Sequence, residues 1–431
     1  MRIFLLAITY FLSFQTYGQN DKVVSWINEN SIKIEDANPD TKLSIFSDNI
    51  PKKFDDAKIF GFGEATHHGK EFFDIKAKFF KYLVEAQNIK VFIIEDSYPS
   101  EAGINEWISG GKGNAKTIAN NFSIAPWYCK EVVNLLEWMR NYNLAKTKDQ
   151  QIRFYGMDIQ NAQNINQEIR DLVKKYNIPI NEELLKVADK CANKKIVYNE
   201  STDWADIQIP KLNEIESILR DFQNDINNEN NVEFNSAIRA LNYLIKYTYY
   251  LQNSKSAVRD LKMFENVKWI IENKAENGKA FIWAHNEHIN NKEMLSYGSA
   301  WISLGGHLKE YYENDYYSVG FDFGIGRLRG FVSKKNEPNY WKTYQLDEPF
   351  RRTYAKTLFE AKEDIYFIDM FEASKNNPTD FFSKKTKQLV LGGPGFNPKQ
   401  YYLIPKKFSE MYDGLIFVKK ITVPNYKLNA K

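Results

Sequence analysis

Two short stretches of the 431-residue chain bring glutamate and histidine together at close spacing. The first reads GFGEATHHG over residues 61–69, in which Glu64 precedes His67 by three positions. The second reads WAHNEH and contains His285 and His288. Together they hold four of the five histidines of the chain. Imidazole titrates near neutral pH, and a neighbouring carboxylate can orient the ring and make it more basic. Both stretches are therefore candidates for acid–base catalysis.

Acidic and imidazole groups follow several apolar segments that have the pattern of buried strands. In a mostly parallel sheet the carboxyl ends of the strands meet at one edge, where α/β proteins expose their chemistry. A single Glu-x-x-His is more often a capping carboxylate beside a surface histidine, but structural histidines would not be expected to collect at one edge. We therefore predict a functional site there. The groups at the strand ends are Glu64 with His67, Glu95, Asp158, His285 with His288, and Asp322.

Hydrophobic spacing predicts the elements that hold these groups. The segment 71–87 has helical spacing, so Glu64 and His67 lie on the turn between a strand and this helix. The strand–helix–strand unit predicts that the strands 58–63 and 91–94 are parallel and adjacent, which would bring Glu95 towards His67. The strands that we predict are 58–63, 91–94, 152–157, 280–283, 317–321, 330–333, 365–368 and 415–418.

The predicted fold class is α/β, with a mostly parallel sheet flanked by helices and an inserted helical subdomain that forms one wall of the active-site cleft. The insertion is polar and reads as successive helices. One of them has an apolar stripe, which we interpret as core, at Phe234, Ile238, Leu241, Ile245 and Tyr249. We assign residues 1–18 to a signal peptide, 19–160 and 279–431 to the α/β core, and 161–278 to the helical subdomain, with a connector at 227–231.

Three charged residues have simpler interpretations beside a functional one. The last helix of the insertion is longer than the strand after it, so its first turn, which carries Arg259, should stand above the carboxyl edge. Arg259 is then either a site residue or the partner of Asp260 or Glu265 in an ion pair at the start of the helix. We interpret Asp158 and Asp322 as caps of neighbouring helices.

Composition restricts the class of function. The chain has 58 basic and 55 acidic residues, a net charge of +3 and no basic stripe, which gives no electrostatic case for nucleic-acid binding. Hydrophobic residues make up 43% of the chain, enough for a large core. The 9 Trp, 26 Tyr and 30 Phe suit either that core or a pocket for a bulky apolar ligand.

The N-terminus has the features of a signal peptide. Arg2 precedes a short apolar run at residues 3–14, and small residues lie just before Gln19. The apolar run is too short to span a bilayer. We therefore predict an exported protein, periplasmic or secreted, without stable membrane insertion. In such a compartment Cys129 and Cys191 either form a disulfide or remain buried thiols.

Hydrolysis by an activated water molecule fits the predicted site best. No serine lies in a G-x-S-x-G motif, and neither cysteine lies near a histidine in the sequence. His67 would act as general base, oriented by Glu64 or Glu95. His285 or Arg259 would stabilise the oxyanion that develops on a carbonyl. The competing chemistry is a zinc or manganese site formed by the two histidines with Glu64 and Glu95.

These motifs resemble those of the erythromycin esterase family. The family pattern of Gly-Glu-Ala-Thr-His-Gly and Glu-Phe-Phe, a helix and a strand ending in glutamate is found from Gly63 onwards, with Glu95 at the strand end. The further matches are Arg-Asp-x-x-Met-x-Glu-Asn at 259–266, Trp-Ala-His-Asn-x-His at 283–288, Gly-Phe-x-Phe at 320–323 and a late strand at 412–415. They cover most of the mature chain in the same order.

The resemblance implies an α/β core, a helical subdomain and a cleft between them. It implies hydrolysis of a macrolide lactone by a water that a histidine activates, with no metal or other cofactor required. Carried over position by position, it makes His67 the base, Glu64 and Glu95 the assisting carboxylates, and His285 the second histidine of the site. We place Arg259 and His288 with the groups that bind substrate or support the oxyanion.

Two positions depart from the family pattern. His68 stands where the family usually has glycine, and Lys76 stands where an arginine is common. Lysine keeps the positive charge but loses the planar fork of the guanidinium group. If that position orients a carboxylate or the substrate, the rate or the substrate range would differ in this protein. We count Lys76 among the groups that bind substrate or support the oxyanion.

We therefore expect a macrolide esterase that confers antibiotic resistance and acts on a small molecule. One alternative is a relative that opens another lactone or an ester of the cell envelope. A second alternative, from another class, is a non-catalytic protein of the same fold that binds a metal or haem. The oligomeric state is left open by the sequence.

Overall fold

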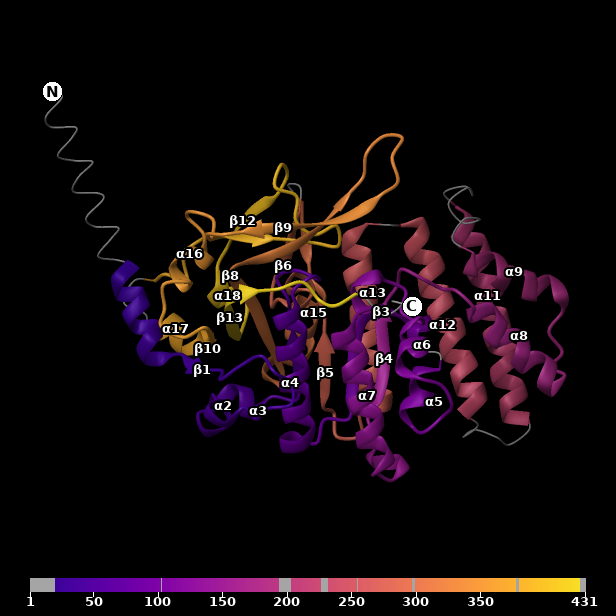
Figure 1. Cartoon of the computed structure of the whole chain (residues 1–431). Helices are drawn as coiled ribbons and strands as arrows, with labels where there is room; N and C mark the ends of the chain where they lie inside the picture. The colour runs from indigo at the N-terminus through magenta and orange to yellow at the C-terminus, as the bar shows by residue number, and fades with distance from the viewer. Residues whose placement is uncertain are drawn as a thin grey trace, which may run out of the picture. The chain divides into compact units, whose positions relative to one another are not determined.

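The structure is a computed structural model (Figure 1) that describes residues 20–101, 103–193, 203–225, 232–253, 255–296, 299–376 and 380–426. The predicted signal peptide at 1–18 and the predicted connector at 227–231 lie outside the described residues. The chain divides into two compact units. The sheet unit lies within residues 1–90, 129–135 and 277–431, and the helical unit within residues 91–128 and 136–276.

The sheet unit is built on strands in the order β1–β10–β13–β8–β2–β5. Strands β13, β8, β2 and β5 run parallel to one another. Strand β1 is antiparallel to β10, β10 to β13, and β9 to β8. The predicted α/β class with a mostly parallel sheet is confirmed. The bounds are β1 (Ile32–Lys33), β2 (Ile59–Phe62), β5 (Ala280–Trp283), β8 (Tyr316–Val332), β9 (Tyr340–Leu346), β10 (Ile365–Asp369) and β13 (Gly414–Ile421).

The strand order corrects one prediction about neighbours. Strand β2 pairs with β5 on one side and with β8 on the other, so it does not lie beside β3 (Val91–Ser97). A strand that follows the inserted helices in sequence occupies that place. The predicted strands at 317–321 and 330–333 are also parts of one long strand, β8.

The pairing of β2 with β5 aligns the two histidine-containing turns. Phe62 is paired with Trp283 at the ends of the strands, and the backbone N–H of Asn286 donates to the carbonyl of Glu64 at 3.0 Å. Gly63 packs directly against Asn286 of the second turn, because a Cβ there would meet Oδ1 of Asn286 at 2.2 Å. This close approach requires glycine at that position.

Helix α4 (Lys70–Gln87) follows the first turn and confirms the predicted helix. It ends at Asn88, whose left-handed conformation (φ 57°) suits asparagine. Phe79 of the helix packs on Phe62 of β2, and Phe62 stacks on Phe281 of β5, with ring centroids 5.1 and 5.0 Å apart. Aromatic packing of this kind holds α4 against the two strands that carry the histidine turns.

The rest of the sheet unit consists of short helices and hairpins around these strands (Figure 1). The helices are α2 (Ser44–Asp48), α3 (Lys52–Asp56), α14 (Asn286–Ile289), α15 (Leu304–Tyr312), α16 (Tyr354–Leu358), α17 (Met370–Asn376) and α18 (Phe408–Met411). The hairpins are β6 (Glu293–Ser296) with β7 (Ser299–Ile302) and β11 (Thr386–Val390) with β12 (Tyr402–Lys406).

The helical unit contains the parallel strands β3 and β4 (Arg153–Asp158) and a bundle of helices. One buried apolar core joins the bundle and includes Phe234, Ile238 and Leu241 of the predicted stripe. Tyr249, which we placed in the same stripe, is 42% exposed and is therefore not a core residue. The bundle helices are α8 (Ile165–Tyr176), α9 (Glu182–Ala192), α11 (Trp204–Asp225), α12 (Val232–Gln252) and α13 (Ser256–Lys274). The shorter helices α5 (Ile104–Ile108) and α6 (Ala115–Ala119) lie between β3 and β4 in sequence, and α7 (Lys130–Leu144) has residues in both units.

Two further observations concern the whole of the described chain. None of the helices in the described ranges is long and apolar enough to cross a membrane. Cys129 and Cys191 are both buried free thiols, which decides the question that the sequence left open. The division into a core and an insertion at residues 160 and 279 stays a prediction.

Candidate active site

The turn between β2 and α4 holds a buried carboxylate–imidazole pair. Oε1 of Glu64 lies 2.6 Å from Nδ1 of His67, while the Glu64 side chain is fully buried and His67 is 7% exposed. A carboxylate only accepts hydrogen bonds, so the neutral ring of His67 carries its proton on Nδ1. Nε2 of His67 is then the nitrogen with the lone pair, as a general base requires.

Lys76 of α4 completes this pair from the other side. Its ammonium group forms an ion pair with Oε2 of Glu64, and neither side chain has any solvent exposure. The same ammonium group lies 4.0 Å from the ring centroid of Trp283 at the end of β5. The spacing of Lys76 along α4 therefore places it beneath Glu64, where it orients the carboxylate rather than a ligand.

His285 lies beside His67, as the pairing of β2 with β5 requires. The ring centroids are 5.0 Å apart and the ring planes are inclined at 52°. The structure thus brings together Glu64, His67, Lys76 and His285, four of the predicted site residues. All four are buried, which keeps their interactions in a low-dielectric environment.

The hydrogen bonds of His285 determine which of its nitrogens carries the proton. Nδ1 accepts from the backbone N–H of Glu287 at 3.2 Å, so the proton of the neutral ring is on Nε2. Nε2 lies 3.1 Å from the carbonyl oxygen of Leu391, to which it donates. His285 is therefore an N–H donor whose hydrogen bond goes to a backbone carbonyl in this conformation.

The segment after Leu391 also contacts the first histidine turn. Nε2 of His68 lies 3.3 Å from the carbonyl oxygen of Gly393, and its Nδ1 lies 2.7 Å from Oη of Tyr426. Burial, followed by the charge of His67, lowers the pKa of His68 to about 3. His68 is therefore neutral near pH 7. It contacts the turn at residues 392–395, in which the N–H of Gly395 donates to the carbonyl of Gly392 at 2.8 Å, instead of acting as a second base.

His288 and Glu287 lie on the short helix α14 and are buried. Glu287 forms a buried ion pair with Lys406 of β12, whose ammonium group also donates to Oε1 of Gln388 at 3.2 Å. Because the backbone of Glu287 donates to His285, this ion pair supports the position of the second histidine. His288 follows on the same helix, and its backbone N–H donates to the backbone carbonyl of His285 at 3.0 Å.

Glu95, Arg259 and Asp158 form a second cluster, within the helical unit. The guanidinium group of Arg259 donates to both oxygens of Asp158 at 2.9 and 2.8 Å and to Oε1 of Glu95 at 2.9 Å. Burial tends to lower the pKa of Arg259, but the two carboxylates raise it well above its usual value. Arg259 therefore remains charged and joins two of the predicted strand-end carboxylates.

This cluster revises two interpretations of single residues. The hydrogen bonds of Arg259 to Asp158 and Glu95 join it to strand-end carboxylates, and the charge of Asp260, the partner in the simpler alternative, also raises its pKa. Asp158 is not a helix cap, because it binds Arg259 and the N–H of Ile159, and α8 begins only at Ile165.

Asp322 is not a helix cap either, because it lies inside strand β8. Oδ1 of Asp322 accepts from the backbone N–H of Phe323, while the buried Oδ2 has no hydrogen-bond partner among the described residues. Burial raises the pKa of Asp322 to about 7. Asp322 is therefore a buried carboxyl group of the sheet, and it has no contact with the histidine pair in the structure.

Sequence reasoning missed three residues that shape the site. Trp283 covers the ammonium group of Lys76, the carbonyl oxygen of Leu391 accepts a hydrogen bond from His285, and Oη of Tyr426 contacts His68. Trp283 is the first residue of the predicted Trp-Ala-His-Asn-x-His motif, so the sequence marked its position but not its contact with Lys76. Leu391 acts through its backbone, and Tyr426 is 358 positions from His68, so no local pattern identifies them.

The competing metal-site chemistry can be compared with this geometry. Within the part of the chain that the structure describes, no group of three or more His, Cys, Asp or Glu side chains is arranged to hold a metal ion. Both oxygens of Glu64 are engaged, by His67 and by the ammonium group of Lys76. A cation bound at Glu64 would be repelled by this buried positive charge. The surroundings of Glu64 therefore favour an acid–base role.

The fold and the site define a class of protein: an α/β protein with a carboxylate–histidine pair at the carboxyl edge of a parallel sheet. The family model "Erythromycin esterase" matches residues 84–421, more than three quarters of the chain. The chain belongs to the erythromycin esterase family and is a hydrolase of that type. The predicted resemblance is thus confirmed. The matched segment includes Glu95, Arg259 and His285, and begins after the turn that carries Glu64.

Relatives with assigned names agree with this placement. The chain is 23% identical over 362 residues to erythromycin esterase type II of Escherichia coli, covering 77% of this chain and 85% of the relative. It is 21% identical over 459 aligned positions to the putative hydrolase YbfO of Bacillus subtilis, covering 98% of each.

Solved structures show the same fold at low sequence identity. A protein of Bacillus cereus has a TM-score of 0.81 and 23% identity, covering 94% of this chain and 99% of that one. A succinoglycan biosynthesis protein has a TM-score of 0.77 and 19% identity, covering 95% and 99%. An erythromycin esterase mutant in its open conformation has a TM-score of 0.64 and 15% identity, covering 92% and 98%.

Proposed function

We propose that this protein opens the lactone ring of macrolide antibiotics such as erythromycin, by attack of a water molecule that His67 activates. The observation that carries the proposal is the buried contact of 2.6 Å between Glu64 and Nδ1 of His67, which leaves Nε2 as the basic nitrogen. Membership in the erythromycin esterase family supports a carboxylic ester as the bond that is broken.

The residues of the turn between β2 and α4 account for each proton transfer in the proposed reaction. Nε2 of His67 takes a proton from water while the water oxygen forms a bond to the lactone carbonyl carbon. Glu64 stabilises the resulting imidazolium ion through Nδ1–H, as the orienting carboxylate does in other histidine-based hydrolases. The tetrahedral intermediate then breaks the ring C–O bond, and the leaving alkoxide takes the proton from His67. The product is a hydroxy acid.

His285 is the proposed donor to the oxyanion. Its Nε2–H donates to the carbonyl oxygen of Leu391 at 3.1 Å, and a substrate carbonyl could replace that acceptor. An N–H aimed at the developing negative charge accelerates acyl transfer because its dipole is already oriented. Exchange of one carbonyl acceptor for another leaves the proton on the same nitrogen, so the ring keeps its tautomer.

Glu95 and Arg259 have proposed supporting roles. The family resemblance assigns Glu95 to assist the base, and Arg259 holds Glu95 at 2.9 Å within the helical unit. Arg259 also remains charged, so the pair could stabilise charge that develops on the substrate. His288 is proposed to contact the substrate or support the oxyanion.

Mass spectrometry of macrolides incubated with the pure protein tests the proposal. We expect erythromycin to gain the mass of one water molecule, and we expect His67→Ala and Glu64→Gln to reduce the rate by about two to four orders of magnitude. Circular dichroism must show that both variants remain folded. If the wild-type protein leaves the drug intact while it hydrolyses other esters, the macrolide assignment is wrong and the esterase assignment stands.

Esters of the cell envelope are a second candidate class of substrate. The predicted signal peptide would deliver the enzyme to that compartment, and we propose that the mature protein is exported. A solved structure of the same fold carries the name of a succinoglycan biosynthesis protein. Acylated polysaccharides therefore belong in the same panel, and release of the acyl group without macrolide cleavage would favour this class.

A further inference from the structure

Strand β8 continues beyond the part of the sheet that carries the histidine turns. It pairs with β2 up to Val319 and with β13 up to Gly326, and from Gly326 onwards it forms a hairpin with β9 (Figure 1). Gly326 has a φ of 142°, a conformation that suits glycine. Arg329 lies three positions further along the strand. The hairpin therefore places Arg329 outside the parallel part of the sheet, where its side chain is half-buried.

The guanidinium group of Arg329 lies over two aromatic rings. Its central carbon is 3.9 Å from the ring centroid of Tyr426 and 4.4 Å from that of Trp341. Such contacts contribute about 0.5–2 kcal/mol each, and they hold the guanidinium group in place without neutralising it. Arg329 also forms a hydrogen bond with the hydroxyl group of Tyr426. A guanidinium group has five N–H donors, so Tyr426 leaves most of this planar fork unused.

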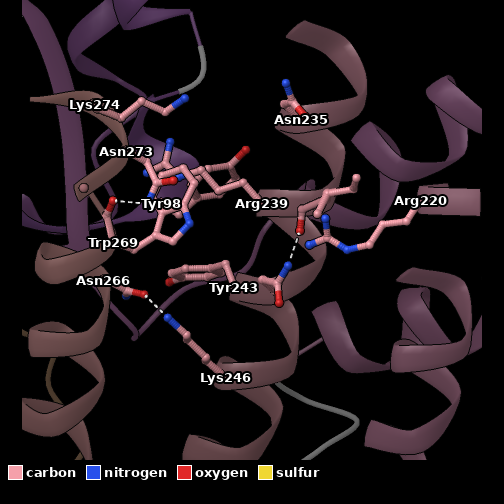
Figure 2. Close-up of a pocket in the computed structure, with 13 residues that line it drawn as sticks. Tyr98, Arg220, Asn235, Arg239, Tyr243, Lys246, Asn266, Trp269, Asn273 and Lys274 are labelled. Carbon is pink, nitrogen blue, oxygen red and sulfur yellow. Dashed lines mark hydrogen bonds between the residues drawn. The ribbon is translucent and has the colours of Figure 1, made fainter. Parts of the chain in front are cut away.

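Arg239 of α12 shows what completes such an arrangement. Its guanidinium carbon lies 4.7 Å from the ring centroid of Tyr98 and 4.8 Å from that of Trp269 (Figure 2). Two nitrogens of Arg239 also bind the carboxylate of Glu101, at 2.6 Å each. Arg329 has the two rings, but no carboxylate of the described residues pairs with it. The comparison indicates that the fork of Arg329 can accept an oxyanion in the same way.

The titratable groups around these rings do not neutralise Arg329. Burial lowers the pKa of His68 to about 3 and raises the pKa of Tyr426, so both side chains are neutral near pH 7. The charge of Glu131 also raises the pKa of Tyr426. Glu131 accepts from the backbone N–H of Asn425 at 3.1 Å and, within the described residues, forms no ion pair with Arg329. A partly buried cation without a counter-ion is stabilised when an oxyanion binds to it.

Short contacts join Arg329 to the first histidine turn. The ring centroid of Trp341 lies 4.7 Å from that of His68. Oη of Tyr426 lies 2.7 Å from Nδ1 of His68 and 3.5 Å from the carbonyl oxygen of His67. Both rings that hold Arg329 therefore contact the turn that carries the proposed base. An anionic group bound at Arg329 would belong to a molecule that lies beside this turn.

The face of the hairpin that carries Arg329 is exposed and polar. Arg329 is paired across the ladder with Thr343, so the two side chains lie on the same face. Thr343 is exposed, whereas Leu328, on the opposite face, is buried. The hydroxyl group of Thr343 can donate and accept, as recognition of a sugar hydroxyl requires. This face therefore suits a hydrophilic ligand.

We propose that Arg329 is a specificity-determining residue that binds the carboxylate of an acidic sugar in the ester substrate. This inference rests on the proposed ester hydrolysis, and within it selects polysaccharides that carry both acyl groups and uronic acids. The planar fork of Arg329 matches the two oxygens of a carboxylate. A neutral sugar of the same shape offers no such pair of acceptors and should bind less tightly.

Calorimetric titration of the full-length protein tests the binding step apart from hydrolysis. The probes are methyl glucuronoside and methyl glucoside, which differ only in a carboxylate or a hydroxymethyl group and contain no acyl ester. We expect the glucuronoside to bind more tightly, and Arg329→Met to weaken it at least about tenfold, the effect of losing one charge-assisted hydrogen bond. Arg329→Lys keeps the charge but loses the fork, so its affinity should lie between the two.

Arg327→Met is the matched control. Arg327 is exposed two positions before Arg329 on the same face of β8, but it lies over neither of the two rings. Its loss removes the same charge from the same face. Since an exposed charge is screened by salt, the affinity for the glucuronoside should change by less than about twofold.

Release of acetate from the O-acetylated forms of the two glycosides tests the role of Arg329 in hydrolysis. We expect Arg329→Met to lower the ratio of kcat/KM for the acidic ester to kcat/KM for the neutral ester at least about tenfold, with little change for the neutral ester. A purely structural role, exerted through Trp341 and His68, would lower both values together.

Several outcomes would overturn the inference. They are absence of binding by the glucuronoside, equal affinity for the two glycosides, equal affinity of the Arg329→Met and Arg327→Met variants, and an equal loss of kcat/KM for both esters. Thermal unfolding shows whether Arg329→Met is folded, and if it is not, Arg329→Gln replaces it. If the glucuronoside binds through Arg329 and neither ester is hydrolysed, the carboxylate site stands and acylated polysaccharides are wrong as the substrate class.

Discussion

Lys76 and Glu64 form an ion pair in which both side chains are fully excluded from solvent. Removing one member leaves a buried charge without a partner, which costs about 3–5 kcal/mol. We expect Lys76→Met to lower the free energy of unfolding by this amount and to abolish hydrolysis, because Glu64 would no longer hold His67. Urea denaturation and the hydrolysis rate measure the two effects.

The control for this prediction is an exposed ion pair of the sheet unit. Lys52 pairs with Asp56 four residues later on α3, and both side chains are mostly exposed, so Lys52→Met should cost less than about 1 kcal/mol. Lys76→Arg keeps the charge and should retain part of the activity. Equal stability of Lys76→Met and Lys52→Met would contradict the ion-pair role.

Arg259 joins Glu95 to Asp158, and its substitution should affect both carboxylates. We expect Arg259→Met to destabilise the protein by about 3–5 kcal/mol, since two buried carboxylates lose their partner. Arg259→Lys keeps the charge but loses the fork that holds Asp158, so it should lie between wild type and Arg259→Met. Lys175→Met, at the exposed ion pair with Glu233 in the same unit, should change stability by less than about 1 kcal/mol. The predicted role of Arg259 is contradicted if Arg259→Met is as stable as this control.

Asp322 should make stability depend on pH. Its folded pKa is about 7, well above the value near 3.8 of an exposed aspartate. Between these values the unfolded state loses its proton first, so stability falls as pH rises through this window and is constant above it. The loss is at most about 4 kcal/mol, from about three pKa units.

Asp322→Asn removes this titration and keeps an acceptor for the N–H of Phe323. We expect the variant to gain stability relative to wild type as pH rises from 5 to 7.5, measured by urea denaturation at both values, because only the wild-type protein must bury an acid that ionises. A constant difference between the two proteins across this range would show that Asp322 has an ordinary pKa.

The ion pair of Glu287 with Lys406 should help to hold His285 in position. Lys406→Met leaves Glu287 buried and uncompensated, and we expect a loss of about 3–5 kcal/mol together with a lower kcat, because the N–H of Glu287 fixes Nδ1 of His285. The double variant Glu287→Leu with Lys406→Met removes both charges and should recover most of the stability. If the double variant is less stable than Lys406→Met, the two charges are not coupled as the structure indicates.

The sequence by itself determined the local elements and their chemistry. The period of the apolar residues predicts β2, α4 and β5, and the residue types after each strand place Glu64, His67 and His285 on turns at the carboxyl edge. These features are local, because a strand or helix and the turn that follows it depend on residues close in the chain. The family could be assigned for the same reason, since its motifs are short and ordered.

Only the tertiary structure decided which groups meet. The hydrophobic pattern predicts that β2 is buried. Many strand orders would bury β2 equally well, so the pattern does not predict that β5 lies beside it. The partners of Lys76 and Arg259 were equally undecided, because any nearby carboxylate satisfies a cation. His285 owes its tautomer to a backbone carbonyl 106 positions away, and no side-chain type records that contact.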